Sequence, residues 1–191
     1  MRRTTATLIL LLSVGSARVS ADTVFVVTAT TGRVEYTTEA GTWRTAFTGR
    51  ETPIGTKVAT RARARVELTF AAHTVTVGGL THVTIDEAEH RDDGAHAALT
   101  VVGGRVIVEH VPDGETFSIV IESPFATVTA RDASFVFDGR GVSVTRGEVV
   151  LMNPSGRSVV LRSGEASRIV NGARPAPIER DREQRSLVSP R

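Results

Sequence analysis

The side chains best able to do chemistry in this sequence are its histidines, two of which lie in one short segment. His90 and His96 flank Asp92-Asp93-Gly94, so the segment holds imidazole and carboxylate groups, which are common ligands of zinc and other divalent metals. The spacing matches no helical zinc motif, and Asp-Asp-Gly is also the composition of a hairpin turn. We predict a solvated turn here, with metal binding as the less favoured alternative, and no cofactor.

Nucleophilic catalysis has no recognisable motif in this chain. The sequence contains no cysteine, which excludes thiol nucleophiles, disulfides, thiolate metal sites and a lipid-anchored N-terminal cysteine. It contains no Gly-x-Ser-x-Gly motif, and Ser134 lies in an alternating apolar run that predicts a strand. Glycine motifs for phosphates or dinucleotides are missing as well. We predict that the protein is not an enzyme, and a hydrolase of envelope polymer is the least favoured hypothesis.

Arg61, Arg63 and Arg65 alternate with alanines, and alternate residues of a strand point to the same face. This spacing would put three guanidinium groups about 7 Å apart in one row, where they could hold an anionic polysaccharide or an acidic protein. Glu67 is the next residue on that side and partly neutralises the row, so a solvated outer face is the simpler alternative. These three arginines are the predicted contact site.

The elements that carry these residues are predicted to be strands. β-Branched and aromatic residues recur in short runs bounded by Gly, Asp, Asn or Pro, and helical periodicity is almost absent. The predicted strands span residues 24–29, 32–36, 63–70, 74–77, 82–85, 99–102, 105–109, 117–121, 126–130, 134–137, 142–145, 149–152 and 159–162. Strands this short and numerous predict a single all-β domain, either a sandwich or barrel or a solenoid-like stack. The irregular glycine spacing leaves these topologies open.

The two ends of the chain differ from the region between them. Arg2 and Arg3 precede an apolar run from Ala6 to Val14, and Val19-Ser20-Ala21 supplies small residues, which together form a signal-peptide pattern. The run is about half the ~20 apolar residues that a membrane-spanning helix needs. We predict a signal peptide over 1–21, a β domain over 22–172 and, from its proline and alternating charge, a flexible tail over 173–191. The mature form is then expected to have no membrane span.

Cleavage would also change the charge of the domain. The whole chain has 23 Lys and Arg against 21 Asp and Glu, and Arg2, Arg3 and Arg18 would leave with the signal peptide. The remainder has 20 basic and 21 acidic residues, a net charge of −1. A domain with no basic excess lacks the main electrostatic attraction for nucleic acid. We therefore predict no nucleic-acid partner.

Two aromatic side chains suggest sugar stacking. Trp43 and Tyr36 each offer a flat ring with a polar group, which suits carbohydrate contacts. A single tryptophan in a domain of this size more often packs in the interior. We therefore expect Trp43 to be a core residue.

Glycine-centred segments recur in a fixed order from about Gly32 to Ile169. They are Gly32-Arg33-Val34, Pro53-Ile54-Gly55-Thr56, Leu99 to Val106, Glu122 to Arg131, Ser134-Phe135-Val136, Gly147-Glu148-Val149 and Leu161 to Glu165. This ordered set resembles the FecR domain, which is found in the periplasmic part of bacterial sigma-factor regulators and in other exported proteins. Two positions depart from the family pattern: Gly55-Thr56 stands in place of Gly-Asp, and Asp132-Ala133 in place of Gly-Thr.

The resemblance implies an all-β domain without catalytic residues that acts by contact with another protein or an envelope ligand. The sigma-regulator members have a cytoplasmic segment and a membrane helix ahead of this domain, whereas here a signal peptide is predicted. We therefore expect a stand-alone exported member, periplasmic or, as the alternative, extracellular, with an envelope protein or polysaccharide as partner. A glycan or peptidoglycan-binding module is the second hypothesis.

Overall fold

The computed structural model describes residues 24–38, 41–170 and 179–180, and the only regular elements in these ranges are β-strands. The strands are β1 (Phe25–Thr31), β2 (Val34–Thr37), β3 (Arg44–Thr45), β4 (Glu51–Thr52), β5 (Lys57–Thr60), β6 (Arg65–Phe70), β7 (His73–Val77), β8 (His82–Arg91), β9 (Gly94–Val101), β10 (Val106–Glu109), β11 (Phe117–Glu122), β12 (Thr127–Phe137), β13 (Gly141–Met152), β14 (Ser158–Arg162), β15 (Glu165–Arg168) and β16 (Glu179–Arg180). The predicted all-β class is confirmed.

The predicted end segments fall largely outside these ranges. The signal peptide, 1–21, lies wholly outside the described residues. Of the predicted tail, 173–191, only Glu179 and Arg180 are described, and their backbones pair with β15.

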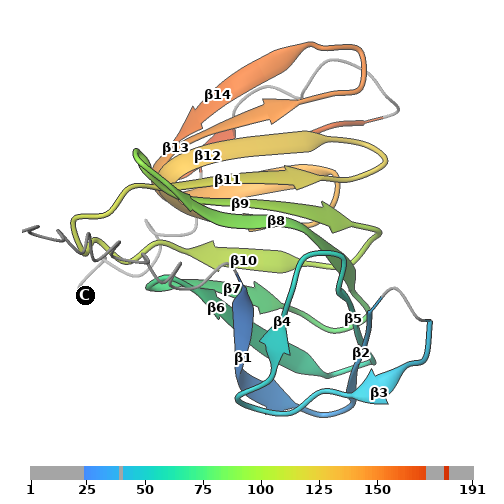
Figure 1. Cartoon of the computed structure of the whole chain (residues 1–191). Helices are drawn as coiled ribbons and strands as arrows, with labels where there is room; N and C mark the ends of the chain where they lie inside the picture. Colours follow the sequence, from blue (N-terminus) through green and yellow to red (C-terminus); the bar gives the residue numbers. More distant parts are fainter. Residues whose placement is uncertain (1–23, 39–40, 171–178, 181–191) are drawn as a thin grey trace, which may run out of the picture.

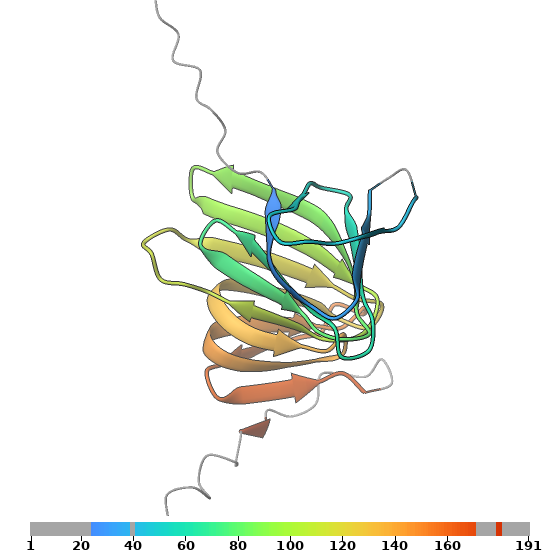
Figure 2. The same cartoon turned by 90° about the horizontal axis from the view of Figure 1, so that it is seen from below.

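The strands form one sheet that divides into two layers at β12 and β13 (Figure 1). The first half of β12 pairs with β11 and its second half pairs with β10, while β13 runs beside both halves. One layer therefore continues as β11-β9-β8-β5-β2-β3, and we call it the first layer. The other continues as β10-β7-β6-β1-β4, and we call it the second layer. Figure 2 shows the same strands from below.

A bulge at Asp132 carries β12 from the first layer to the second. The register with β13 shifts between Arg131 and Ser134, and Asp132 has a φ of 51°. Extra residues in one strand bend it locally, which is how strands pass from one layer to another. The two predicted strands over 126–130 and 134–137 are therefore one bent strand, and those over 142–145 and 149–152 likewise form β13.

The chain also crosses between layers at β10. β9 and β11 are parallel neighbours in the first layer, and β10, which connects them in sequence, lies in the second layer. Parallel strands need a crossover connection, and a single strand of the opposite layer supplies it here. The fold is thus one curled sheet with two facing layers, and the chain passes from one layer to the other at β10 and at β12. We call it the two-layered stack.

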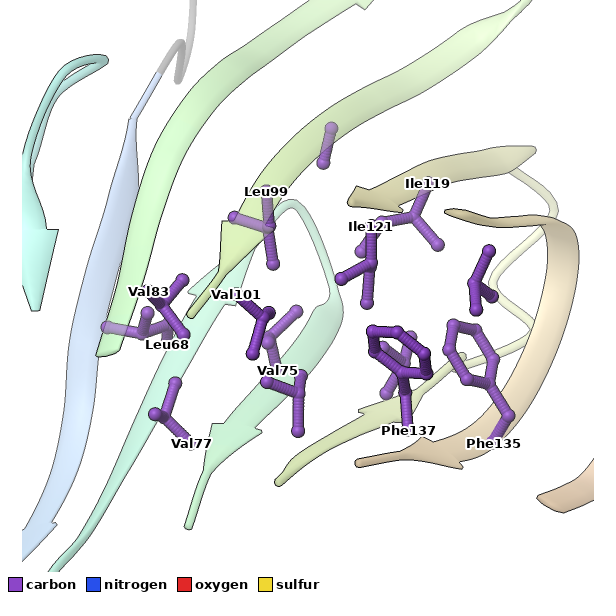
Figure 3. Packing of buried hydrophobic residues seen from close by; sticks show 14 of the residues in the cluster. Leu68, Val75, Val77, Val83, Leu99, Val101, Ile119, Ile121, Phe135 and Phe137 are labelled. Carbon is purple, nitrogen blue, oxygen red and sulfur yellow. The ribbon is translucent and has the colours of Figure 1, made fainter. Parts of the chain in front are cut away.

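The hydrophobic core fills the space between the layers. Ile119 and Ile121 of the first layer lie near Phe135 and Phe137 of the second (Figure 3), and the four side chains are at most 1% exposed. Burying aliphatic and aromatic side chains of this size contributes roughly 1.5–3 kcal/mol each. Alternation along the strands, as in β6 with its buried Val66, Leu68 and Phe70, puts these residues inside and leaves polar residues outside.

Candidate functional site

The three predicted contact arginines do not lie on one strand. β5 ends at Thr60 and β6 begins at Arg65, so Arg61 and Arg63 lie in the loop between them. Arg63 has a φ of 59°, a left-handed conformation that a strand residue does not adopt. The predicted row at strand spacing is therefore wrong. The loop forms a turn in which the Ala64 amide donates to the Arg61 carbonyl at 3.0 Å, and Ala64 itself is buried.

Two of the three arginines form ion pairs with glutamates. Arg61 Nη2 lies 3.0 Å from Glu35 Oε2, and Arg33 Nη2 lies 2.7 Å from the other oxygen of the same carboxylate. The hydrogen bond from Arg33 is the main cause that lowers the pKa of Glu35, and Arg61 lowers it further against the opposing effect of burial. Arg65 Nη2 lies 2.8 Å from Glu67 Oε1, as the predicted neutralisation by Glu67 requires.

Strand pairing gathers Arg61 and Arg63 with other arginines at one end of the two-layered stack. In the second layer Arg65 pairs with Thr31, and Val77 pairs with both Val66 and Val106, so the adjoining loops meet (right side of Figure 1). The loops at this end span 32–33, 61–64, 78–81, 102–105, 123–126, 138–140 and 153–157. Their charged residues are Arg33, Arg61, Arg63, Arg105, Arg140, Arg157 and one acid, Asp138. We call these seven loops the arginine end.

Two buried threonines hold three of these loops together. The Thr60 hydroxyl donates to the Gly78 carbonyl at 2.5 Å and accepts from the Thr81 amide at 3.0 Å. The Thr81 hydroxyl in turn accepts from the Arg105 amide at 2.9 Å. A threonine hydroxyl can both donate and accept, so this pair links the loops that carry Arg61, Leu80 and Arg105. We call Thr60 and Thr81 the threonine clamp.

Exposed apolar side chains lie among the arginines. Leu80 is 70% exposed and Val102 is 63% exposed, in neighbouring loops of the arginine end. Phe125 is 43% exposed, and the Arg140 guanidinium lies 3.6 Å from the centre of its ring. Arginine beside apolar and aromatic residues is typical of protein contact surfaces. The sequence pattern did not reveal this surface, since it depends on loops brought together by pairing of distant strands.

The histidine segment forms the predicted turn. Asp92 and Asp93 connect β8 to β9, in which Arg91 pairs with Gly94. The two histidines have separate partners, because His90 Nδ1 lies 2.9 Å from Glu115 and His96 Nε2 lies 2.9 Å from Asp93. Within the described ranges, no three His, Asp or Glu side chains are grouped so that they could hold a metal ion.

The prediction that Trp43 is a core residue is wrong. Its side chain is 46% exposed, and its ring centre lies 6.4 Å from that of His82. Trp43 precedes β3, a two-residue strand that pairs only with β2 among the described strands, so no opposing layer covers it. Tyr36, by contrast, is buried, and the Arg50 guanidinium lies 4.8 Å from its ring centre.

Comparison with known proteins shows a likeness of fold. Two crystal structures of a candidate anti-sigma factor from Parabacteroides distasonis ATCC 8503, at 1.65 and 2.50 Å resolution, resemble this chain with TM-scores of 0.53 and 0.54. Each is 16% identical in sequence, and the match covers 69% of this chain and 62% of the other. No family model and no curated protein matches the sequence. Nor does the described part contain a helix with the length and apolar character needed to cross a membrane. The chain therefore has the all-β fold of part of a candidate anti-sigma factor.

Proposed function

We propose that this chain is a FecR-like domain, exported to the cell envelope, that acts by binding an acidic envelope protein through its arginine end. The fold likeness and the order of glycine-centred segments support the family, and the predicted signal peptide supports export. The observation that carries the proposal is the arginine end itself. Six arginines against one acid, with exposed Leu80 and Val102 among them, form a surface suited to a partner that is acidic at its rim.

The arginine end has groups available for a partner. Arg63 and Arg105 form no ion pair within the described part of the chain, so a partner's carboxylates would not have to displace internal ones. The threonine clamp fixes the loops of Leu80 and Arg105 in advance, which reduces the entropy lost on binding. Arginine stays protonated at all ordinary pH values and serves as an anion contact. The proposed action is therefore contact and not catalysis.

The experiment is site-specific crosslinking in cells of the native host. A photoreactive residue at Val102 is expected to capture one envelope protein, whereas the same residue at Val160, on the outer face of β14, is not. Arg63→Gln combined with Arg105→Gln should weaken the capture about tenfold, and added salt should weaken it too because exposed charges are screened.

A control variant and a binding assay distinguish a protein partner from a polysaccharide partner. Arg162→Gln, on β14, is the control variant and should leave capture unchanged. Equal capture from Val102 and Val160 would contradict the proposal, as would capture that is indifferent to the double substitution. Retention of the purified chain on anionic polysaccharide, with no protein captured in cells, would instead support the glycan-binding hypothesis.

A further inference from the structure

The end of the two-layered stack opposite the arginine end is acidic. Its loops span 71–72, 92–93, 110–116 and 163–164, on the left in Figure 1. Their charged residues are Asp92, Asp93, Asp113 and Glu115, with no Lys or Arg among them. Counted over the loops alone, this end has a net charge of −4 against +5 at the arginine end; Arg91, Arg131, Asp132 and Arg146 lie on the strands that adjoin these loops. We call the four loops the acidic end.

The acidic end is hollowed and held in shape. The β8–β9 turn and the loop between β10 and β11 line an open hollow of about 470 Å³, whose charged lining residues are Asp92, Asp93, Glu115 and one cation, Arg91. The Ala95 amide donates to the Thr116 carbonyl at 2.8 Å, which joins the two loops. Gly94 permits this approach, because a Cβ at that position would lie 2.2 Å from the Thr116 oxygen. The hollow is thus a preformed feature of the fold.

Within the described ranges, none of the four carboxylates in the loops of the acidic end forms an ion pair with arginine or lysine. Asp93 and Glu115 each pair with a histidine, and Asp92 forms no ion pair within the described ranges. The hydrogen bond from His96 is the main cause that lowers the pKa of Asp93, so this group is a carboxylate at neutral pH. Val111, which is 45% exposed, lies in the same loop as Glu115 and gives the acidic end an exposed apolar side chain.

The two ends of the stack therefore have complementary charges. The arginine end has guanidinium groups in the loops of Leu80 and Val102, and the acidic end has a hollow lined mainly by carboxylates and the exposed Val111 in one of its loops. The two ends lie on opposite sides of a rigid two-layered stack and cannot meet within one molecule (Figure 1). Two copies can bring them together with charge complementarity and without rearranging the fold.

We propose that copies of this chain associate end to end, with the arginine end of one copy bound to the acidic end of the next. Such a contact joins two different surfaces, so it repeats along a row of copies and is not limited to a symmetric dimer. The proposal does not depend on the proposed function, although both use the arginine end. The last copy of a row keeps a free arginine end for another partner.

The test is sedimentation velocity of the purified chain over a range of concentrations. At low ionic strength the mean mass is expected to rise with protein concentration. In ~1 M salt, where the Debye length is about 3 Å, the chain should sediment as a monomer. A chain that stays monomeric at low ionic strength and high concentration would overturn the proposal, while capture of another protein in cells would be unaffected.

Two neutralised variants make the test specific. Arg63→Gln with Arg105→Gln removes charge from the arginine end, and Asp92→Asn with Glu115→Gln removes it from the acidic end. Each variant alone should self-associate about tenfold more weakly than the unmodified chain. Mixed together, they retain one intact contact and should form 1:1 dimers but no longer rows.

A control variant and a folding check complete the design. Lys57→Gln, at an exposed residue of β5 that lies in neither set of loops, should associate like the unmodified chain. Circular dichroism should show that both neutralised variants keep their β structure. If the neutralised variants associate as strongly as the unmodified chain, or if their mixture stays monomeric, the end-to-end contact is wrong.

Discussion

Gly104→Ala is expected to remove a large part of the folding free energy, whereas the neighbouring Gly103→Ala should have a much smaller effect. Both glycines have positive φ, 88° and 107°, so an alanine at either position is strained by about 1–2 kcal/mol. Their surroundings differ. A Cβ on Gly104 would lie 2.0 Å from Thr81 Oγ1 and 2.7 Å from Thr81 Cα, whereas a Cβ on Gly103 would meet no atom within 4 Å.

The threonine clamp explains why the clash between a Cβ at position 104 and Thr81 cannot be relieved without a large loss of free energy. Thr81 is fully buried, its amide donates to the Thr60 hydroxyl, and its own hydroxyl accepts from the Arg105 amide. Moving Thr81 away from a Cβ would break these bonds, and each buried polar group left without a partner costs about 1–3 kcal/mol. We expect a loss of about 3 kcal/mol or more, against a total stability that is typically 5–15 kcal/mol.

Urea denaturation followed by circular dichroism measures both variants. The midpoint for Gly104→Ala should fall far below that of the unmodified chain, and the midpoint for Gly103→Ala should fall only slightly. Equal midpoints for the two alanine variants would show that Thr81 does not constrain Gly104. Gly104→Ala should also weaken crosslinking from Val102, because the clamp positions the loops of the arginine end.

Local patterns predicted the strands, because alternation of apolar and polar residues reports directly on which side of a layer is buried. The same patterns predicted breaks at Asp132 and at Gly147, where the chain bends and continues. A bulge arises from the way a strand pairs with its neighbour, so it cannot be predicted from the sequence of that strand alone. Gly147 is needed there because a Cβ would lie 2.9 Å from the Asp132 carbonyl, a contact between residues of two strands.

The predicted arginine site also shows that local sequence does not determine which residues come together. Arg61, Arg63 and Arg65 fit a strand by spacing alone, yet Ala64 is buried in a turn and the strand begins only at Arg65. Arg105 could not be grouped with them, because it is distant in sequence and its loop is joined to theirs by Thr60 and Thr81. Residue type thus identified arginine as a contact group, while strand register decided which arginines share a surface.

The folded protein is expected to lose stability as the pH falls below about 7, because of one buried histidine. His73 has no exposed surface, and its ring packs face to face between Phe117, with centres 4.2 Å apart, and His110, with centres 4.9 Å apart. Its Nδ1 accepts a hydrogen bond from the Val111 amide at 3.3 Å. Its Nε2 is buried without a partner among the described residues, as is Nδ1 of His110.

Burial lowers the pKa of His73, because the imidazolium would lose its hydration, and His110 lowers it further. Asp113, Glu115 and Asp132 act in the opposite direction and do not reverse the shift. In the unfolded chain a histidine has its ordinary pKa of about 6.5. As the pH falls, the unfolded chain therefore binds a proton before folded His73 does. The stability that depends on neutral His73 is fully present above pH ~6.5. It decreases as the pH falls, until folded His73 is itself protonated, and the free energy of unfolding changes by at most about 1.4 kcal/mol per pH unit.

His73→Phe tests this origin, since phenylalanine keeps the ring packing and cannot be protonated. The free energy of unfolding should be measured in urea at several pH values between about 5 and 8. The variant loses the hydrogen bond from Val111, so the slope with pH is compared and not the stability at one pH. We expect a shallower slope for His73→Phe and an unchanged slope for His82→Phe, the same substitution at an exposed histidine. A slope that His73→Phe leaves as steep as before would assign the acid sensitivity to other groups.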